Sequence, residues 1–223
     1  MLKYKCLVLD HDDTVVQSEA TVNYPFFVYI LDKFRPGTKI TLAEYVHGCC
    51  HLGFADMCRK WYAFTEQELV EEYHAWQEYI KEHTPAPFPG IEQIIRRQKE
   101  AGGLICVVSH SCNENITRDY TTHFGIQPDD IFGWDYPEHQ RKPNPWPLQQ
   151  IMAKYCLTPQ DLLVVDDMKP AYEMASCAGV PIAFAAWGRR DYPEIMEQMT
   201  SLCDYTFLQT QDLERFLFEE DCS

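Results

Sequence analysis

The chain has 223 residues, with 34 acidic and 19 basic side chains, and its formal net charge at neutral pH is −15. A protein this acidic repels nucleic-acid phosphates and anionic membrane surfaces, which argues against both as partners. Apolar residues make up 46% of the chain, which is typical of a folded protein with one large domain, or one domain carrying an insertion.

The first predicted element is a buried strand over residues 4–9, where a continuous apolar run ends in Asp10. Acidic residues follow this short run at once, so it does not have the pattern of a signal peptide. No apolar run in the chain approaches the roughly 18 residues that a membrane span needs.

Three carboxylates, those of Asp10, Asp12 and Asp13, crowd into four positions directly before Thr14. Carboxylates this close resist ionising together, and a hard divalent cation such as Mg²⁺ relieves their repulsion. An acidic turn that caps the following helix is the structural alternative. His11 lies between the acids; its polar side chain could contact the substrate, but we expect it to be exposed to solvent.

Residues 16–84 contain no run typical of a buried strand and are predicted to be helical. Thr65 and Glu68 have the spacing of a capping box at the start of a helix. The Pro-rich stretch 84–90 that follows has the composition of a stiff linker. One apolar face is predicted on the last helix, formed by Leu69, Val70, Tyr73, Trp76, Tyr79 and Ile80.

The rest of the chain alternates between apolar strand runs and helical patterns. One helix is indicated over residues 91–98, before Gly102, and another follows Pro170 and stops at Gly179. Continuous apolar runs are typical of strands covered on both faces, so we predict a doubly wound α/β fold with a parallel sheet. The further strand runs are 104–108, 131–134, 162–165, 182–186 and 205–208.

Two domains follow from these patterns. The α/β core is predicted over residues 1–15 and 85–223. An all-helical domain is predicted over residues 16–84, inserted between the first and second strands of the core.

Polar residues end three of the predicted strands: Asp10, Ser109 and Asp166, the last followed by Asp167. Ligands bind beyond the carboxyl ends of parallel strands, so these side chains are predicted to converge. Lys142 lies in a Pro-rich loop and is a candidate for neutralising a transferring phosphoryl group. Each residue alone has an ordinary alternative, a helix cap for Ser109 or Asp166 and a solvated surface lysine for Lys142.

Taken in order, D-x-D-x-T, a strand-end Ser, Lys-Pro and a strand-end Asp-Asp resemble the four motifs of the haloacid dehalogenase superfamily. The resemblance covers nearly the whole chain. The helical insertion is similar to the cap of the phosphoglycolate phosphatase and β-phosphoglucomutase type, on a Rossmann-like core. The motif residues are Asp10, Asp12, Thr14, Ser109, Lys142, Asp166 and Asp167.

The resemblance implies a catalytic role for most of these residues. Asp10 would be the nucleophile that forms an aspartyl-phosphate. Asp12 would protonate the leaving oxygen and then act as a base toward water. Thr14 would orient the substrate-binding loop, and Ser109 and Lys142 would bind the phosphoryl group.

Mg²⁺ is the cofactor that the resemblance implies. It would be held by Asp10, the backbone carbonyl of Asp12, and Asp166, with Asp167 assisting directly or through water. Two departures from the family pattern affect this set: Val165 stands where Gly is common, and the second acid directly follows the first. They leave open which acid of the pair ligates the metal directly.

A cap of this type usually closes over the site and contacts the leaving group. Arg59 and Lys60 are the cap's candidates for binding an anionic or ring-bearing leaving group, with a solvated helix face as the alternative. His110, just after the second motif, is a further substrate-binding candidate. His47 and His51 can share a helix face, but no second ligand pair stands at a spacing typical of zinc.

Three functions fit these residues. The favoured one is a Mg²⁺-dependent phosphatase of a small phosphorylated metabolite, a phosphoric monoester hydrolase. A phosphomutase would differ by excluding water and returning the phosphoryl group to a sugar. A non-catalytic metabolite-binding protein on the same fold is the third, although the intact motifs argue against it. Mg²⁺-independent dehalogenases of the superfamily lack the second Asp of the first motif.

Ten cysteines are scattered along the chain, and no signal peptide accompanies them. This pattern indicates reduced thiols in the cytoplasm, and Cys6, Cys106 and Cys177 fall in apolar stretches. We therefore expect a cytoplasmic monomer or weak homodimer that acts on a small phosphorylated metabolite and has no nucleic-acid or membrane partner.

Overall fold

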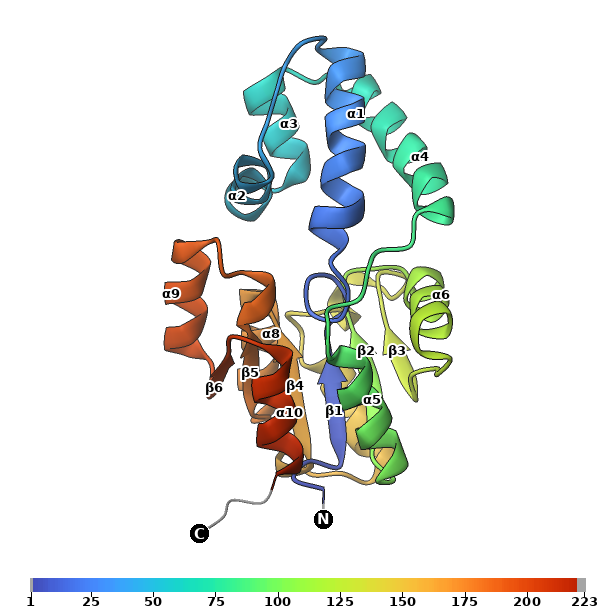
Figure 1. Ribbon diagram of the computed structural model, residues 1–223, viewed down its shortest axis with the longest axis vertical. Helices are drawn as coiled ribbons and strands as arrows, with labels where there is room; N and C mark the ends of the chain where they lie inside the picture. Colours follow the sequence, from blue (N-terminus) through green and yellow to red (C-terminus); the bar gives the residue numbers. More distant parts are fainter. Residues whose placement is uncertain (1, 220–223) are drawn as a thin grey trace. The chain divides into compact units, whose positions relative to one another are not determined.

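The computed structural model describes residues 2–219 and divides into two compact units (Figure 1). The first unit comprises Met1–Val16 and Pro87–Ser223, and the second comprises Gln17–Ala86. The sequence places the corresponding boundaries at 15/16 and 84/85.

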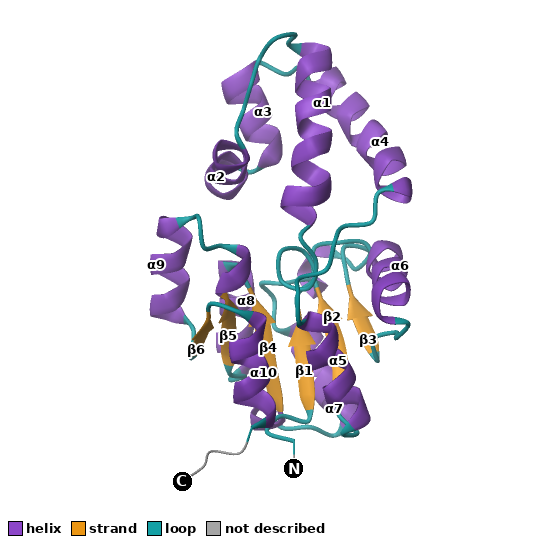
Figure 2. Cartoon of the chain, viewed as in Figure 1, coloured by secondary structure: helices purple, strands orange, loops and turns teal. Residues whose placement is uncertain are grey.

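A single parallel sheet forms the centre of the first unit (Figure 2). Its strands within residues 2–219 are β1 Cys6–Leu9, β2 Leu104–Val108, β3 Asp130–Phe132, β4 Leu162–Asp166, β5 Ile182–Ala185 and β6 Tyr205–Phe207. They lie in the order β3-β2-β1-β4-β5-β6, and every neighbouring pair is parallel. The chain therefore runs outward from β1 in both directions, which confirms the predicted doubly wound α/β class.

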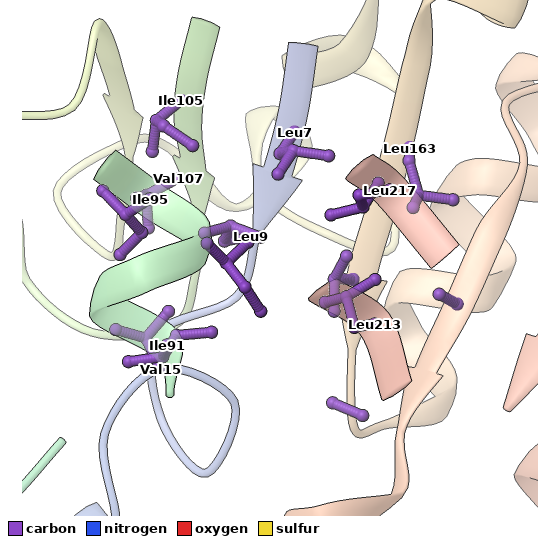
Figure 3. Packing of buried hydrophobic residues seen from close by; sticks show 14 of the residues in the cluster. Leu7, Leu9, Val15, Ile91, Ile95, Ile105, Val107, Leu163, Leu213 and Leu217 are labelled. Carbon is purple, nitrogen blue, oxygen red and sulfur yellow. The ribbon is translucent and has the colours of Figure 1, made fainter. Parts of the chain in front are cut away.

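Alternate residues of β1 pack into two different hydrophobic layers, because successive side chains of a strand point to opposite faces. Leu7 and Leu9 join the layer beneath α5 (Ile91–Glu100), α6 (Asn113–Phe124) and α10 (Thr210–Phe218). Figure 3 shows Leu9 packed in this layer with neighbouring residues of the cluster. The predicted apolar face at the start of α5 is thus buried.

The other face of the sheet is covered by α7 (Trp146–Tyr155) and α8 (Lys169–Ala178), which pack against Cys6 and Val8. Gly179 ends α8 with a φ of 67°, the left-handed conformation that glycine adopts at low cost. The helix α9 (Pro193–Leu202) covers the end of the sheet, where it packs against Phe184. With both faces covered, the central strands are apolar along their whole length, as the sequence predicts.

The second unit is entirely helical, as predicted. A short π-helix, Glu19–Asn23, leads into α1 (Tyr24–Phe34), followed by α2 (Leu42–Leu52), α3 (Phe54–Tyr62) and α4 (Glu66–Glu82). The predicted capping box of Thr65 and Glu68 is present at the start of α4. The predicted apolar face of α4 is wrong in part, because Val70 and Tyr73 are exposed while the acidic Glu72 is buried.

Glu72 faces the interior of the helical unit, and burial raises the pKa of its carboxyl from 4.5 to about 7. The folded protein therefore holds a proton that the unfolded chain releases near pH 4.5. Between these two values the folded state binds more protons, so stability falls as the pH rises. We expect Glu72→Gln to raise the unfolding free energy at pH 8 by about 1–3 kcal/mol and to change it little at pH 4.5.

Thermal unfolding at the two pH values checks this expectation. The matched control is Glu71→Gln, because the adjacent Glu71 is exposed and pairs with Lys33 at 2.6 Å. An exposed ion pair contributes little to stability, so this control is expected to shift the midpoint only slightly. An equal gain in unfolding free energy at both pH values would contradict the expectation, because it would show that ionisation of Glu72 does not destabilise the folded protein.

The nine cysteines within residues 2–219 are free thiols. Cys6 and Cys106 are buried on adjacent strands, with 3.7 Å between their sulfurs. Cys177 lies on α8 but is exposed, so its expected burial is wrong, while Cys222 lies outside the described residues. No helix among residues 2–219 combines the length and the apolar content needed to cross a membrane.

Candidate active site

The sheet register brings the motif residues of β1, β2 and β4 to one edge. Leu9 pairs with Val107 on one side and with Val165 on the other. The next residue, Asp10, follows Leu9 out of the sheet, and its backbone N–H donates to the Val165 carbonyl at 2.9 Å. Asp10 therefore lies beside Asp166 at the carboxyl edge of the sheet, where parallel strands leave room for a ligand.

Lys142 lies between two of these carboxylates and is buried. Its ammonium donates to Asp10 at 2.8 Å and to Asp166 at 2.7 Å. Only 6% of the residue is exposed, so the alternative of a solvated surface lysine is wrong. Ser109, also buried, follows β2 beside this group, and its hydroxyl contributes a hydrogen bond to Asp10.

The charges of this group depend on one another. Burial by itself would raise the pKa of Asp10, but the charge and hydrogen bond of Lys142 hold this pKa below its usual value. Burial and the Asp10 charge raise the pKa of Asp166 well above its usual value. The same two carboxylates raise the pKa of Lys142, although its burial opposes this. Ionisation of Asp166 is therefore disfavoured while Asp10 is ionised beside it.

Asp10, Asp166 and Asp167 form a buried cluster that is suited to a metal ion. Each offers a carboxylate oxygen, and these oxygens all lie within 4.8 Å of one another. Burial raises the pKa of Asp167 to about 6, even though the neighbouring Arg189 charge lowers it. Carboxylate oxygens are the ligands that Mg²⁺ prefers, and a bound cation would relieve this repulsion. The donor set therefore fits the cofactor that the sequence implies.

Asp12 and Thr14 lie on the same loop as Asp10, which we call the β1 loop and define as residues 10–16. Asp12 is half-buried and accepts a hydrogen bond from the Ser111 hydroxyl. Thr14 is buried, and its hydroxyl lies 3.4 Å from Oδ1 of Asp167. Asp12 is thus the most open of the three carboxylates of this loop, while Thr14 faces Asp167.

The expected exposure of His11 is wrong. The residue is 1% exposed, and its Nε2 lies 3.0 Å from the buried Oδ2 of Asp119 on α6. Its ring also stacks on Tyr120, with 6.1 Å between the ring centroids. The side chain is buried in the core, where Asp119 is a long-range partner for Nε2 while Nδ1 makes no hydrogen bond.

Arg189 is a site residue that the sequence analysis missed. It follows β5 and is 6% exposed. Its Nε donates to Asp167 at 2.6 Å, and its Nη2 lies 3.1 Å from a carboxylate oxygen of Asp13. The sequence signal was a basic pair just past a buried strand, which is indistinguishable from an ordinary solvated turn.

The three substrate-binding candidates outside the motifs occupy different environments. The Nε2–H of His110 donates a hydrogen bond to the Lys142 carbonyl at 2.9 Å, and burial lowers the pKa of the ring. Arg59 and Lys60 belong to the helical unit, where both pair with Asp56. Arg59 also pairs with Glu66 at 2.7 Å. Local acids therefore neutralise both of these cations within their own unit.

Comparison with known proteins identifies the family. A model of the haloacid dehalogenase-like hydrolases matches residues 7–185, a stretch that includes all of the motif residues. The chain belongs to this family. No curated protein matches the sequence.

Solved structures of other haloacid dehalogenase-like proteins share the fold of the chain at low sequence identity. A predicted phosphoglycolate phosphatase from Haemophilus somnus has 18% identity and a TM-score of 0.74, over 97% of this chain and 99% of that one. CbbY from Rhodobacter sphaeroides, solved with xylulose-1,5-bisphosphate, has 17% identity and a TM-score of 0.69, over 94% and 96%. A β-phosphoglucomutase candidate from Bacteroides vulgatus has 19% identity and a TM-score of 0.66, over 96% and 88%.

Proposed function

We propose that this haloacid dehalogenase-like hydrolase is a Mg²⁺-dependent phosphatase that hydrolyses a small phosphorylated metabolite through an aspartyl-phosphate. The observation that carries the proposal is the buried group at the carboxyl edge of the sheet. Asp10 is ionised there beside Lys142, and further carboxylates lie within reach of a shared cation. Phosphoryl transfer needs little beyond a positioned nucleophile and neutralised charge, and this group offers both.

In the first half-reaction Asp10 is the nucleophile. One of its carboxylate oxygens forms a bond to phosphorus while the bond between phosphorus and the leaving oxygen breaks. Asp12 donates a proton to that leaving oxygen, and its half-buried position leaves it accessible to a substrate. Lys142 and Ser109 bind the phosphoryl oxygens, for which their buried ammonium and hydroxyl are suited.

In the second half-reaction the ionised Asp12 takes a proton from a water molecule. The oxygen of this water forms a bond to phosphorus, and the bond between phosphorus and Asp10 breaks. Inorganic phosphate leaves, and the Asp10 carboxylate is restored. One carboxyl serves both halves because its first task leaves it deprotonated for the second.

Asp10, Asp166 and Asp167 would hold Mg²⁺, with the backbone carbonyl of Asp12 as a further ligand. The bound ion would neutralise charge between the anionic nucleophile and the anionic phosphoryl group. Asp166 and Asp167 both remain ligands in this proposal, because both belong to the buried cluster.

The proposed substrate is small, and Arg59, Lys60 and His110 are proposed to contact its leaving group. The acidic composition of the chain disfavours nucleic acids and membranes as partners. We propose that the protein is cytoplasmic and acts as a monomer or weak homodimer.

Phosphate release from a panel of phosphorylated metabolites and an aryl phosphate tests the proposal. We expect removal of divalent cations with a chelator to lower the rate at least about 100-fold, because the ion supplies several kcal/mol of charge stabilisation, and added Mg²⁺ to restore it. An undiminished rate in protein whose metal content has been measured as negligible would contradict the metal dependence. Turnover only in the presence of a sugar bisphosphate would favour the phosphomutase instead.

A further inference from the structure

Three consecutive residues that follow β5, Trp187, Gly188 and Arg189, contact the β1 loop. The Trp187 indole N–H donates to the Thr14 carbonyl at 3.0 Å. Gly188 approaches the Asp13 backbone so closely that a Cβ there would lie 2.1 Å from the Asp13 carbonyl oxygen. Arg189 then reaches the Asp13 carboxylate. We call the segment Trp187–Arg189 the β5 clasp.

Arg189 also joins the β1 loop to the end of β4. Its guanidinium pairs with Asp13 at 3.1 Å and with Asp167 at 2.6 Å, and all three side chains are buried. A buried charge is tolerated only when it is paired and well oriented, so the geometry of this bridge is restricted. A planar guanidinium can satisfy two carboxylates in fixed directions, which an ammonium cannot do equally well.

The Asp13 backbone needs such support. Its φ is 53°, a left-handed conformation that is unfavourable for most residues with a side chain, although Asp and Asn adopt it more readily than others. Its N–H donates to the Val16 carbonyl at 2.7 Å, which closes the loop locally. Asp12 immediately precedes Asp13, so a change in this turn would also move the backbone of Asp12.

We propose that Arg189 is a positioning residue for the reaction, and that the β5 clasp holds the β1 loop in place relative to Asp167. The guanidinium holds Oδ2 of Asp167, which leaves Oδ1 on the side of the Thr14 hydroxyl. Arg189 thus orients one acid of the metal cluster and, through Asp13, the loop that carries Asp10 and Asp12. This inference rests on the proposed function.

A purely structural role for Arg189 predicts a different outcome. A residue that only stabilises the fold would lower the unfolding midpoint without changing the folded protein's kcat or Mg²⁺ affinity. Residues that orient metal ligands typically change affinity or activity about 10–100-fold when they are lost. Mg²⁺ binding to the folded protein therefore separates the two roles, and it needs no turnover.

The test compares Arg189→Met with Arg190→Met, which removes the same charge one residue along, at an exposed side chain that donates to the Leu208 carbonyl. Calorimetry measures the Kd of Mg²⁺, steady-state kinetics give kcat and KM, and thermal melts show whether each variant is folded. We expect Arg189→Met to weaken Mg²⁺ binding and lower kcat about 10–100-fold, with a smaller change in KM. Arg190→Met should match the parent.

Two further variants decide the matter if Arg189→Met does not fold. Arg189→Lys keeps the charge but loses the planar guanidinium that can contact two carboxylates. Asp13→Asn keeps a side chain that tolerates the left-handed backbone but loses the ion pair. Each is expected to lower kcat by about 3–10-fold, as a partial loss of the same support. Kd and kcat within about twofold of Arg190→Met in every folded variant would overturn the proposal.

The design separates this inference from the proposed function. If the parent protein releases no phosphate from any compound, the proposed function fails. The effect of Arg189→Met on Mg²⁺ affinity is still expected in that case. If the parent turns over normally and Arg189 changes neither Kd nor kcat, the inference alone fails.

Discussion

Asp10→Asn is expected to lower phosphate release at least about 1,000-fold, because loss of a covalent nucleophile typically removes most of the rate enhancement. The amide is nearly isosteric with the carboxylate but lacks the nucleophilic oxygen that forms the acyl phosphate. Steady-state phosphate release with saturating Mg²⁺ measures the effect. Phosphate or substrate binding should persist, because Lys142 and Ser109 are unchanged.

The fold of this variant is expected to survive. The substitution removes the ion pair with Lys142 but also relieves the repulsion that raises the pKa of Asp166. These two effects offset each other, so the melting midpoint should stay within about 4 °C of the parent, the shift that about 1 kcal/mol causes at this chain length. Turnover near the parent rate in a folded variant would refute the nucleophile assignment.

Lys142→Met is expected to affect both stability and activity. Removing the ammonium leaves Asp10 and Asp166 buried without their shared cation, and breaking a buried pair typically costs about 3–5 kcal/mol. The loss of a charge directed at the phosphoryl oxygens should lower kcat at least about 100-fold. Saturating Mg²⁺ should recover more stability in this variant than in the parent, because the ion would neutralise the same two carboxylates.

Lys154→Met is the matched control for this substitution. Lys154 also pairs with a carboxylate, that of Asp130 at 2.7 Å, but its side chain is 55% exposed. Its loss should cost no more than about 1 kcal/mol and leave kcat unchanged. Melting curves and phosphate-release assays on both variants provide the comparison. Equal effects of the two substitutions would contradict a special role for the buried lysine.

The sheet could be predicted from the sequence because its strands are covered on both faces. A strand in that position is apolar at every residue, so Leu104–Val108 and the residues before Asp166 stand out from the rest of the chain. Turn-forming residues allowed helix ends to be predicted, as at Gly179. The ends of the strands were predicted less exactly: β1 begins at Cys6, two residues after the start of the apolar run.

The parts of the site that could not be predicted depend on contacts between residues far apart in the sequence. His11 is buried because Asp119, 108 residues away, lies opposite it on α6. Arg189 joins the site only because parallel pairing places the end of β5 next to β4. A polar residue in a loop has no periodic pattern that shows whether such a partner exists.

The helical unit was predicted in class but not in the orientation of its last helix. The spacing of Val70 and Tyr73 fits an apolar face, yet both are exposed while Glu72 is buried. The hydrophobic pattern of α4 is ambiguous because acidic residues lie among its apolar and aromatic residues. Packing against the other helices, which the pattern of one helix does not reveal, decides which side is covered.

Chemical trapping of the covalent intermediate tests the central claim most directly. The protein is mixed with Mg²⁺ and a substrate that it turns over, quenched rapidly and treated with borohydride, which reduces an aspartyl-phosphate to homoserine. Peptide mass spectrometry then locates the modified residue, with substrate-free protein and Asp10→Asn as controls. The account predicts homoserine at position 10 in the parent alone. Steady turnover with no modification at position 10, or modification at another carboxylate, would contradict it.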